Sequence, residues 1–149
     1  MTPSGSKSDT DRVTSSEIRT AALAYVRDRR LLQARSADKE AFYMVGGKID
    51  AGESAVDALH REIREELGTD IVGESVEELG VFEAEAFGHP AGTQLHMTCF
   101  LADLADEPAP SSEIAEIRYF TVAEYAAMPH VAPGSMLVFR RLQSMGLVD

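Results

Sequence analysis

The chain has little that could cross-link it or anchor it in a membrane. Its 149 residues include one cysteine, Cys99, so an internal disulfide is excluded and a reducing, cytoplasmic location is expected. No apolar run approaches the roughly 20 residues that a membrane-spanning helix needs. No apolar segment follows Met1 closely either, so we expect no signal peptide.

Positive charge is also scarce. Fourteen lysine and arginine residues stand against 25 aspartates and glutamates, which gives a formal net charge of −11. Such a chain repels polyanions, so we expect it to bind neither a nucleic acid polymer nor an anionic membrane. If its substrate carries phosphates, a divalent cation must bridge the two sets of negative charge. The chain has no Cys/His spacing that would predict a zinc site.

The rest of the composition is that of one globular domain. With 44% hydrophobic residues, a chain of this length can bury about two-thirds of its unfolded surface. Residues 1–16 are small and polar, so we expect a flexible N-terminal tail there. Residues 17–149 should then form a single domain.

The most informative stretch runs from Gly46 to Ile71, where a glycine-rich loop leads into a helix. Glycine breaks regular structure and lets the backbone approach a ligand closely. Ser54 has the character of a helix N-cap, and Gly68 that of a C-cap. These two residues predict a helix over residues 55–67.

This helix should have two different faces. At about 100° per residue, one stripe is apolar and should pack on the core; it consists of Val56, Leu59, Ile63 and Leu67. Glu62, Glu65 and Glu66 share the neighbouring stripe with the small residues Ala55 and Ala58, which would leave room above it. Neighbouring carboxylates repel one another, and oxygen-only ligands suit Mg²⁺ or Mn²⁺. The ordinary alternative is a solvated acidic face.

The spacing of the charged residues favours the metal-binding interpretation. The order is Gly47, Glu53, Arg61-Glu62, Ile63, Glu65-Glu66 and Gly68, which fits G-x5-E-x7-R-E-U-x-E-E-x-G with an apolar residue at U. Seven fixed positions at roughly one in fifteen each would match by chance on the order of once in 10⁸ start sites. The stretch resembles the signature box of the Nudix hydrolases. Two neighbouring positions depart from the family pattern: Thr69 replaces an aliphatic residue and Val45 a frequent proline.

The resemblance implies hydrolysis of a nucleoside diphosphate that is linked to a further group. Water attacks phosphorus, and Mg²⁺, or Mn²⁺ as an alternative, stabilises the charge. The metal ligands implied by the resemblance are the Gly46 carbonyl and the carboxylates of Glu62, Glu65 and Glu66. Arg61 would orient Glu53 through a bidentate contact, although an ordinary loop-to-helix salt bridge would look the same.

Further catalytic and binding residues are less well determined. The general base is expected to be Glu113, with Glu116 as second choice, or a glutamate of the box such as Glu65. For Glu113 and Glu116, a solvent-facing surface role is the alternative. Lys48 and Gly47 could contact the substrate, although Lys48 could equally be an ordinary exposed lysine. Base stacking could involve Phe42, Tyr43, Phe87 or Tyr119, for each of which a core role is the stronger expectation.

The substrate itself is left open. The short chain is similar to the branch of the family that removes oxidised or non-standard nucleoside triphosphates. ADP-ribose, other nucleotide sugars and dinucleoside polyphosphates are alternatives. A non-catalytic nucleotide-binding regulator is disfavoured, because all the box carboxylates are present. Dimers are frequent in the family, so a homodimer is a further open point.

The order of the elements predicts the fold class. We expect strands at residues 20–26, 31–34, 42–45, 76–87, 93–104 and 117–120, and helices at 55–67, 122–128 and 136–145. The two long strands should form a hairpin around the turn at residues 88–92. This order predicts an α+β fold, an α/β/α sandwich around a mixed β-sheet, and the Nudix resemblance implies the same.

Overall fold

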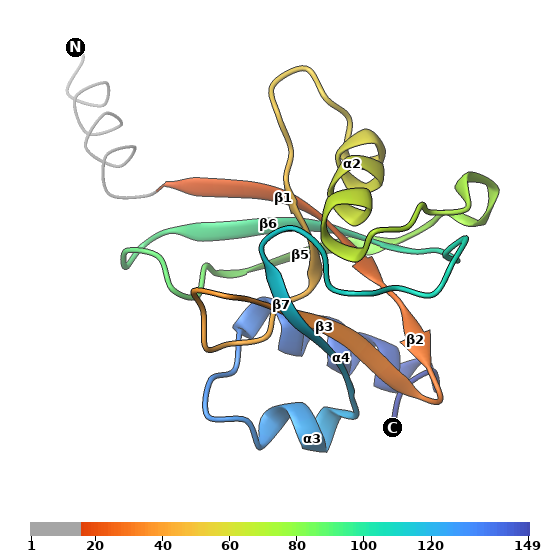
Figure 1. The fold of residues 1–149 in the computed structure, drawn as a ribbon. Helices are drawn as coiled ribbons and strands as arrows, with labels where there is room; N and C mark the ends of the chain where they lie inside the picture. Colours follow the sequence, from red (N-terminus) through yellow and green to blue (C-terminus); the bar gives the residue numbers. More distant parts are fainter. Residues whose placement is uncertain (1–15) are drawn as a thin grey trace, which may run out of the picture.

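A computed structural model describes residues 16–149, so the tail expected at residues 1–16 lies outside the described residues except for Ser16. The elements follow one another along the chain as shown in Figure 1. They are β1 (Glu17–Ala24), β2 (Val26–Arg27), β3 (Arg30–Ser36), β4 (Val45–Lys48), α2 (Ala55–Leu67), the 3₁₀ turn η1 (Gly73–Ser75), β5 (Glu77–Glu85), β6 (Gln94–Leu101), β7 (Ile114–Phe120), α3 (Val122–Ala126) and α4 (Pro133–Ser144).

Two sheets make up the β-structure. The larger has the strand order β4-β1-β6-β5 and is mixed, since β1 is parallel to β6 and antiparallel to β4. The smaller has the order β2-β3-β7. Strands β5 and β6 pair as the predicted antiparallel hairpin. The α+β class and the mixed sheet are therefore confirmed.

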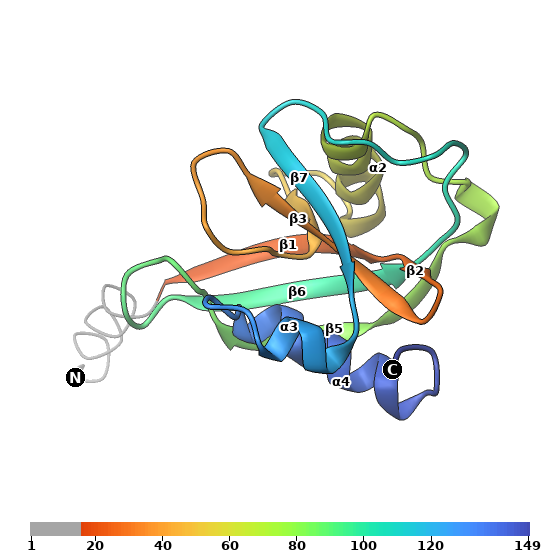
Figure 2. The same cartoon turned by 60° about the horizontal axis from the view of Figure 1, so that its bottom comes forward.

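Helices cover both faces of the larger sheet. Figure 2 shows α2 on one side of β1 and β6, and α3 and α4 on the other. Side chains that alternate along β1 serve both sides: Ala21 and Leu23 join the core under α2, and Ala22 and Ala24 join the core under α4. Cys99 is buried in the second of these cores, and burial raises the pKa of its thiol to about 12. The layers are thus those of an α/β/α sandwich.

Helix α2 has the bounds that its caps predict. The Ser54 hydroxyl accepts a hydrogen bond from the Asp57 N–H at 3.1 Å, and Gly68 ends the helix with φ +66°. Leu59, Ile63 and Leu67 are buried as expected. Ala58 is buried as well, so the expectation that it lies open beside the glutamates was wrong. Ala58 instead lies in the core between α2 and the sheet, with Ala21 and Leu23 of β1.

The strand expected at residues 20–26 is divided into β1 and β2, which lie in different sheets. Two further strand boundaries that differ from the sequence prediction lie near the box. The strand expected at residues 42–45 begins at Val45 and continues through Gly46 and Gly47, because these glycines pair with β1. The last strand begins at Ile114 rather than at residue 117, because it pairs with β3 over almost the whole length of that strand. Glu116 therefore lies within a strand and not in a loop.

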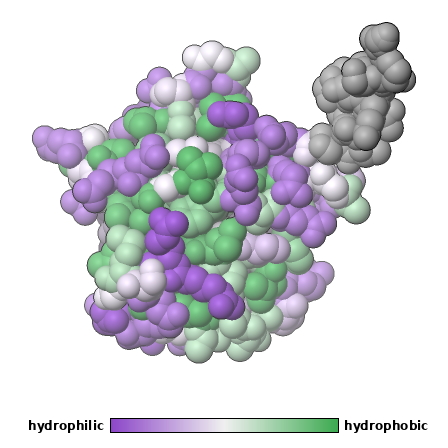
Figure 3. All heavy atoms as spheres, turned by 180° about the vertical axis from the view of Figure 1, so that it is seen from behind, coloured by the Kyte–Doolittle hydropathy of each residue, from purple (hydrophilic) through white to green (hydrophobic). Residues whose placement is uncertain are grey.

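The surface of the described chain has few large exposed apolar side chains. On the face opposite to that of Figure 1, apolar residues are interspersed with polar ones (Figure 3). The exposed large apolar residues are Val81, Phe87, Leu137, Met145 and Leu147. No helix within residues 16–149 combines the length and the hydropathy that crossing a bilayer would require.

Candidate active site

The candidate site lies where strand β4 meets helix α2. The Gly46 N–H donates a hydrogen bond to Glu66 Oε1 at 2.9 Å. A Cβ atom on Gly47 would lie only 2.4 Å from the carboxyl carbon of Glu62, so the Glu62 carboxylate rests on the bare Cα of this glycine. The two glycines of the box thus bring two of its carboxylates against the backbone of the sheet.

Arg61 organises the acidic side chains around it. Its guanidinium binds Glu53 with two hydrogen bonds, from Nε at 2.9 Å and from Nη2 at 2.8 Å. Nη1 donates to Glu62 at 2.7 Å, and Nη2 also donates to the Lys48 carbonyl at 3.0 Å. The Arg61 side chain and a backbone N–H from Asp50 lower the pKa of Glu53 to about 2. The bidentate contact expected from the resemblance is therefore present in the structure.

Glu66 is the box carboxyl whose ionised form is the most disfavoured. Burial raises its pKa to about 7, and repulsion from Glu62, Glu65 and Glu113 adds to the effect, while the Gly46 N–H acts against it. Glu65 itself is more exposed than Glu62. This set of oxygen donors fits a hard divalent cation, because a cation would relieve both the desolvation and the repulsion.

The glutamates do not yet converge on one point. Within residues 16–149, no group of three or more His, Cys, Asp or Glu side chains is gathered closely enough to hold an ion. Glu62 is turned toward Arg61, and Glu66 is turned toward the Gly46 N–H. Binding of an ion would therefore require side-chain rotation of these glutamates.

The two candidate bases outside the box have different surroundings. Glu113 is exposed in the turn before β7 and lies near enough to Glu66 to raise its pKa. Glu116 is paired with Arg118 at 2.8 Å and with Arg35 at 3.5 Å, and these contacts lower its pKa. The structure thus brings Glu113, and not Glu116, to the box.

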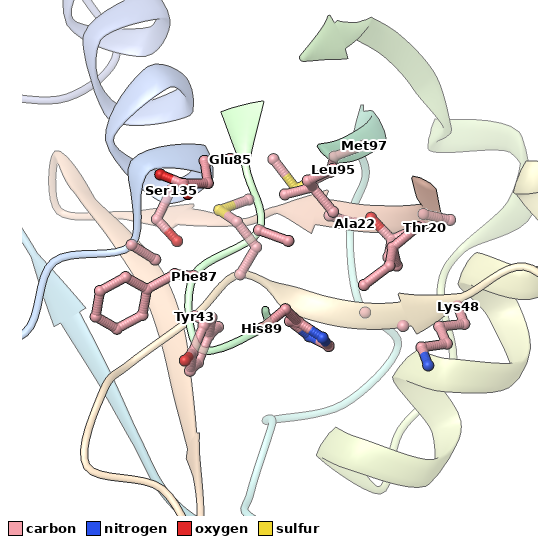
Figure 4. A pocket seen from close by; sticks show the side chains of 18 residues that line it. Thr20, Ala22, Tyr43, Lys48, Glu85, Phe87, His89, Leu95, Met97 and Ser135 are labelled. Carbon is pink, nitrogen blue, oxygen red and sulfur yellow. The ribbon is translucent and has the colours of Figure 1, made fainter. Parts of the chain in front are cut away.

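A cleft with two compartments borders the box. The first, of about 210 Å³, is apolar and lies between β1, β4, β6 and the first turn of α4. The second, of about 350 Å³, is more polar and extends to Glu66. Both are lined by Tyr43, Met44, Gly46, Lys48, Phe87 and His89. Figure 4 shows the first compartment with Lys48 toward one end and Ser135 and Phe87 toward the other.

Two of the four aromatic candidates lie at this cleft. The rings of Tyr43 and Phe87 are 6.2 Å apart and tilted by 52°, and both line the two compartments. Phe42 is buried in the core against Phe120, and Tyr119 packs near Tyr25 away from the cleft. Sequence reasoning missed Met44 and the start of α4, including Ser135. The sequence pattern gave no indication that residues so far apart would meet.

Comparison with known proteins gives a family and a fold. The NUDIX domain model matches residues 17–141. The solution structure of the E. coli ORF135 protein matches with 24% identity and a TM-score of 0.69, covering 90% of this chain and 94% of that one. A MutT NUDIX hydrolase from Burkholderia pseudomallei matches with 21% identity and a TM-score of 0.70, covering 86% and 99%. The MutT protein from Methanosarcina mazei Go1 matches with 16% identity and a TM-score of 0.71, covering 89% and 96%. The search of curated proteins found no match.

Proposed function

Since the chain belongs to the Nudix family of hydrolases, we propose that it is a Mg²⁺-dependent pyrophosphohydrolase of a nucleotide-type substrate. The first candidate is a nucleoside triphosphate, including oxidised or non-standard forms. The observation that supports this function best is the half-buried Glu66 carboxyl near Glu62, Glu65 and Glu113 at the edge of a cleft. Repulsion from these three neighbours disfavours the charge on Glu66, and a cation bound among them would relieve it.

The site residues would have three roles: metal binding, orientation of the carboxylates and acceptance of a proton. Glu62, Glu65, Glu66 and the Gly46 carbonyl would hold Mg²⁺, which when bound supplies a Lewis acid and neutralises phosphate charge. Arg61 would keep Glu53 and Glu62 in fixed rotamers through the three hydrogen bonds that it donates to them. The attacking water must lose a proton, and the exposed carboxylates of Glu65 and Glu113 are the proposed acceptors.

The cleft suggests how the substrate would lie. The apolar compartment, with Tyr43 and Phe87 at its rim, suits a base and its sugar, since aromatic rings stack on bases. The polar compartment, which reaches Glu66, suits the phosphates. Lys48 and Gly47 line the cleft where the two parts of the substrate would join, and we propose both as substrate contacts.

A product-resolved screen tests this function. Folded protein with Mg²⁺ should release nucleoside monophosphate or orthophosphate from at least one member of a panel. The panel should contain normal and oxidised nucleoside triphosphates, ADP-ribose, other nucleotide sugars and dinucleoside polyphosphates. Binding of nucleotide and metal without turnover on any of them would instead support a non-catalytic regulator.

Replacing Arg61 with lysine should slow hydrolysis by about 10- to 100-fold, as is typical when a partner of metal ligands is lost. An ammonium group cannot reproduce the bidentate contact with Glu53 while also reaching Glu62. The apparent Mg²⁺ affinity should weaken together with kcat, and both are measured by titrating Mg²⁺ in steady-state assays.

Arg64→Lys is the matched control for this variant. Arg64 lies on the same helix, is largely exposed and pairs with Asp70 at 2.6 Å. Its replacement should leave both the rate and the Mg²⁺ dependence close to those of the wild type. Equal effects of the two substitutions would contradict the proposed role of Arg61.

A further inference from the structure

The positive charges of the described chain are unevenly placed around the cleft. Residues 16–149 contain two lysines, Lys39 and Lys48, and both line the polar compartment. No arginine lines either compartment. In a chain with a net charge of −11, both lysines of the described part thus line the compartment that extends to the half-buried Glu66.

Among the described residues, these lysines also differ from most of the arginines in having no carboxylate partner. The arginines with an aspartate or glutamate within 4 Å are Arg27, Arg29, Arg30, Arg35, Arg61, Arg64 and Arg118. Across residues 16–149, neither Lys39 nor Lys48 has such a partner. Their ammonium groups are therefore available to an anion that enters the compartment.

The loop that carries Lys39 is held in place by backbone contacts. The Lys39 N–H donates to the Ser36 carbonyl at 3.0 Å, and the Ala37 N–H donates to the Glu113 carbonyl at 2.9 Å. Arg35 Nη1 donates to the Lys39 carbonyl at 3.0 Å, and Arg35 is itself held by Glu116. This framework holds the backbone of Lys39 near the turn that carries Glu113, just before β7.

The two lysines occupy different places along the cleft. Lys48 lines both compartments, whereas Lys39 lines only the polar one. A substrate whose base occupies the apolar compartment would therefore pass Lys48 first and reach Lys39 with its far end. An ammonium group at that end favours a phosphate over an uncharged sugar, because hydrogen bonds between charged groups are the stronger ones.

We propose that Lys39 is a substrate-binding residue that contacts the phosphate farthest from the nucleoside. On this basis the enzyme selects nucleoside triphosphates over nucleotide sugars. The inference rests on the proposed function, since it assumes that the polar compartment takes the phosphates. It assigns the selection of triphosphates over nucleotide sugars to the loop that carries Lys39, which lies outside the signature box.

The test compares two substrates in the Lys39→Ala variant. The ratio of kcat/KM for a nucleoside triphosphate to kcat/KM for ADP-ribose should fall about tenfold, since a hydrogen bond between charged groups is lost. The lower ratio should come mainly from a higher KM for the triphosphate. Lys39→Arg should restore most of the wild-type ratio. Arg140→Ala is the matched control, because Arg140 is exposed on α4 and lines neither compartment; the ratio should not change.

A binding measurement separates this inference from the proposed function. Calorimetry with inorganic tripolyphosphate should give a Kd about tenfold higher for Lys39→Ala than for the wild type, whether or not the protein turns over any substrate. An unchanged substrate ratio, or equal tripolyphosphate affinities for the two proteins, would overturn the role of Lys39. A wild-type protein without hydrolytic activity would instead overturn the proposed function.

Discussion

Replacing Glu66 with glutamine is expected to lower kcat at least about 100-fold while the protein stays folded. Glutamine has the same shape and can still accept the hydrogen bond from the Gly46 N–H, which lies 2.9 Å from Glu66 Oε1. It removes the negative charge that would hold Mg²⁺. The loss should not be smaller than the 10- to 100-fold effect typical of residues that only support metal ligands.

The same variant should change how stability depends on pH. The pKa of Glu66 is raised from 4.5 to about 7 in the folded protein, so the folded state binds this proton more tightly than the unfolded state. The resulting stabilisation is present below pH 4.5 and is lost as the pH rises through 7. In metal-free buffer, Glu66→Gln should therefore lose less stability than the wild type between pH 5 and pH 8.

Thermal unfolding with EDTA and with Mg²⁺ measures both effects. At pH 8, Mg²⁺ should raise the Tm of the wild type and raise that of Glu66→Gln much less, because a ligand stabilises the state that it binds. Glu74→Gln, which changes an exposed glutamate of η1, controls for the loss of one charge. A Glu66→Gln protein with a near-normal kcat would remove this residue from the proposed metal site.

Replacing Gly46 with alanine is expected to lower the free energy of unfolding by at least about 4 kcal/mol, which is exceptional for one substitution. The new Cβ would lie 2.1 Å from the Ala21 carbonyl oxygen and 2.8 Å from the Ala22 Cα. These are backbone atoms of β1, which pairs with β4 at this position and cannot rotate away as a side chain could. The φ of +140° at Gly46 adds strain for any other residue.

Gly52→Ala provides the matched control for this effect. Gly52 also has a positive φ, +80°, but a Cβ there would have no heavy atom within 4 Å. The cost should therefore be only the roughly 1–2 kcal/mol of a left-handed conformation. Chemical denaturation of both variants gives the comparison. Similar values for the two would show that strand β4 can move away from β1.

The local features of the site could be predicted from the sequence, because each depends on residues that are near in the chain. Ser54 and Gly68 fix the ends of α2 through contacts within one turn of the helix. The Arg61–Glu53 contact joins residues that are eight positions apart, across the N-cap and the first two turns of the helix. Such contacts are determined by spacing alone.

The remaining features depend on which strands become neighbours, and spacing does not determine that. Gly46 lies in a strand rather than a loop because β1 runs beside it. Glu116 is paired with Arg35 because β3 and β7 pair over their length. Thr69 replaces the usual aliphatic residue and is nevertheless buried, because its hydroxyl accepts a hydrogen bond from the Asp106 N–H at 3.0 Å.

The packing of α2 has a consequence for how the protein could take up its ion. Leu59, Ile63 and Leu67 hold one side of the helix in the interior, and Ala58 is buried in the same core. The glutamates on the other side are thus carried by a helix that is already packed on the core without a bound ion. Capture would need the Glu62 carboxylate to turn away from Arg61 and the Glu66 carboxylate to turn away from the Gly46 N–H, without movement of the helix backbone.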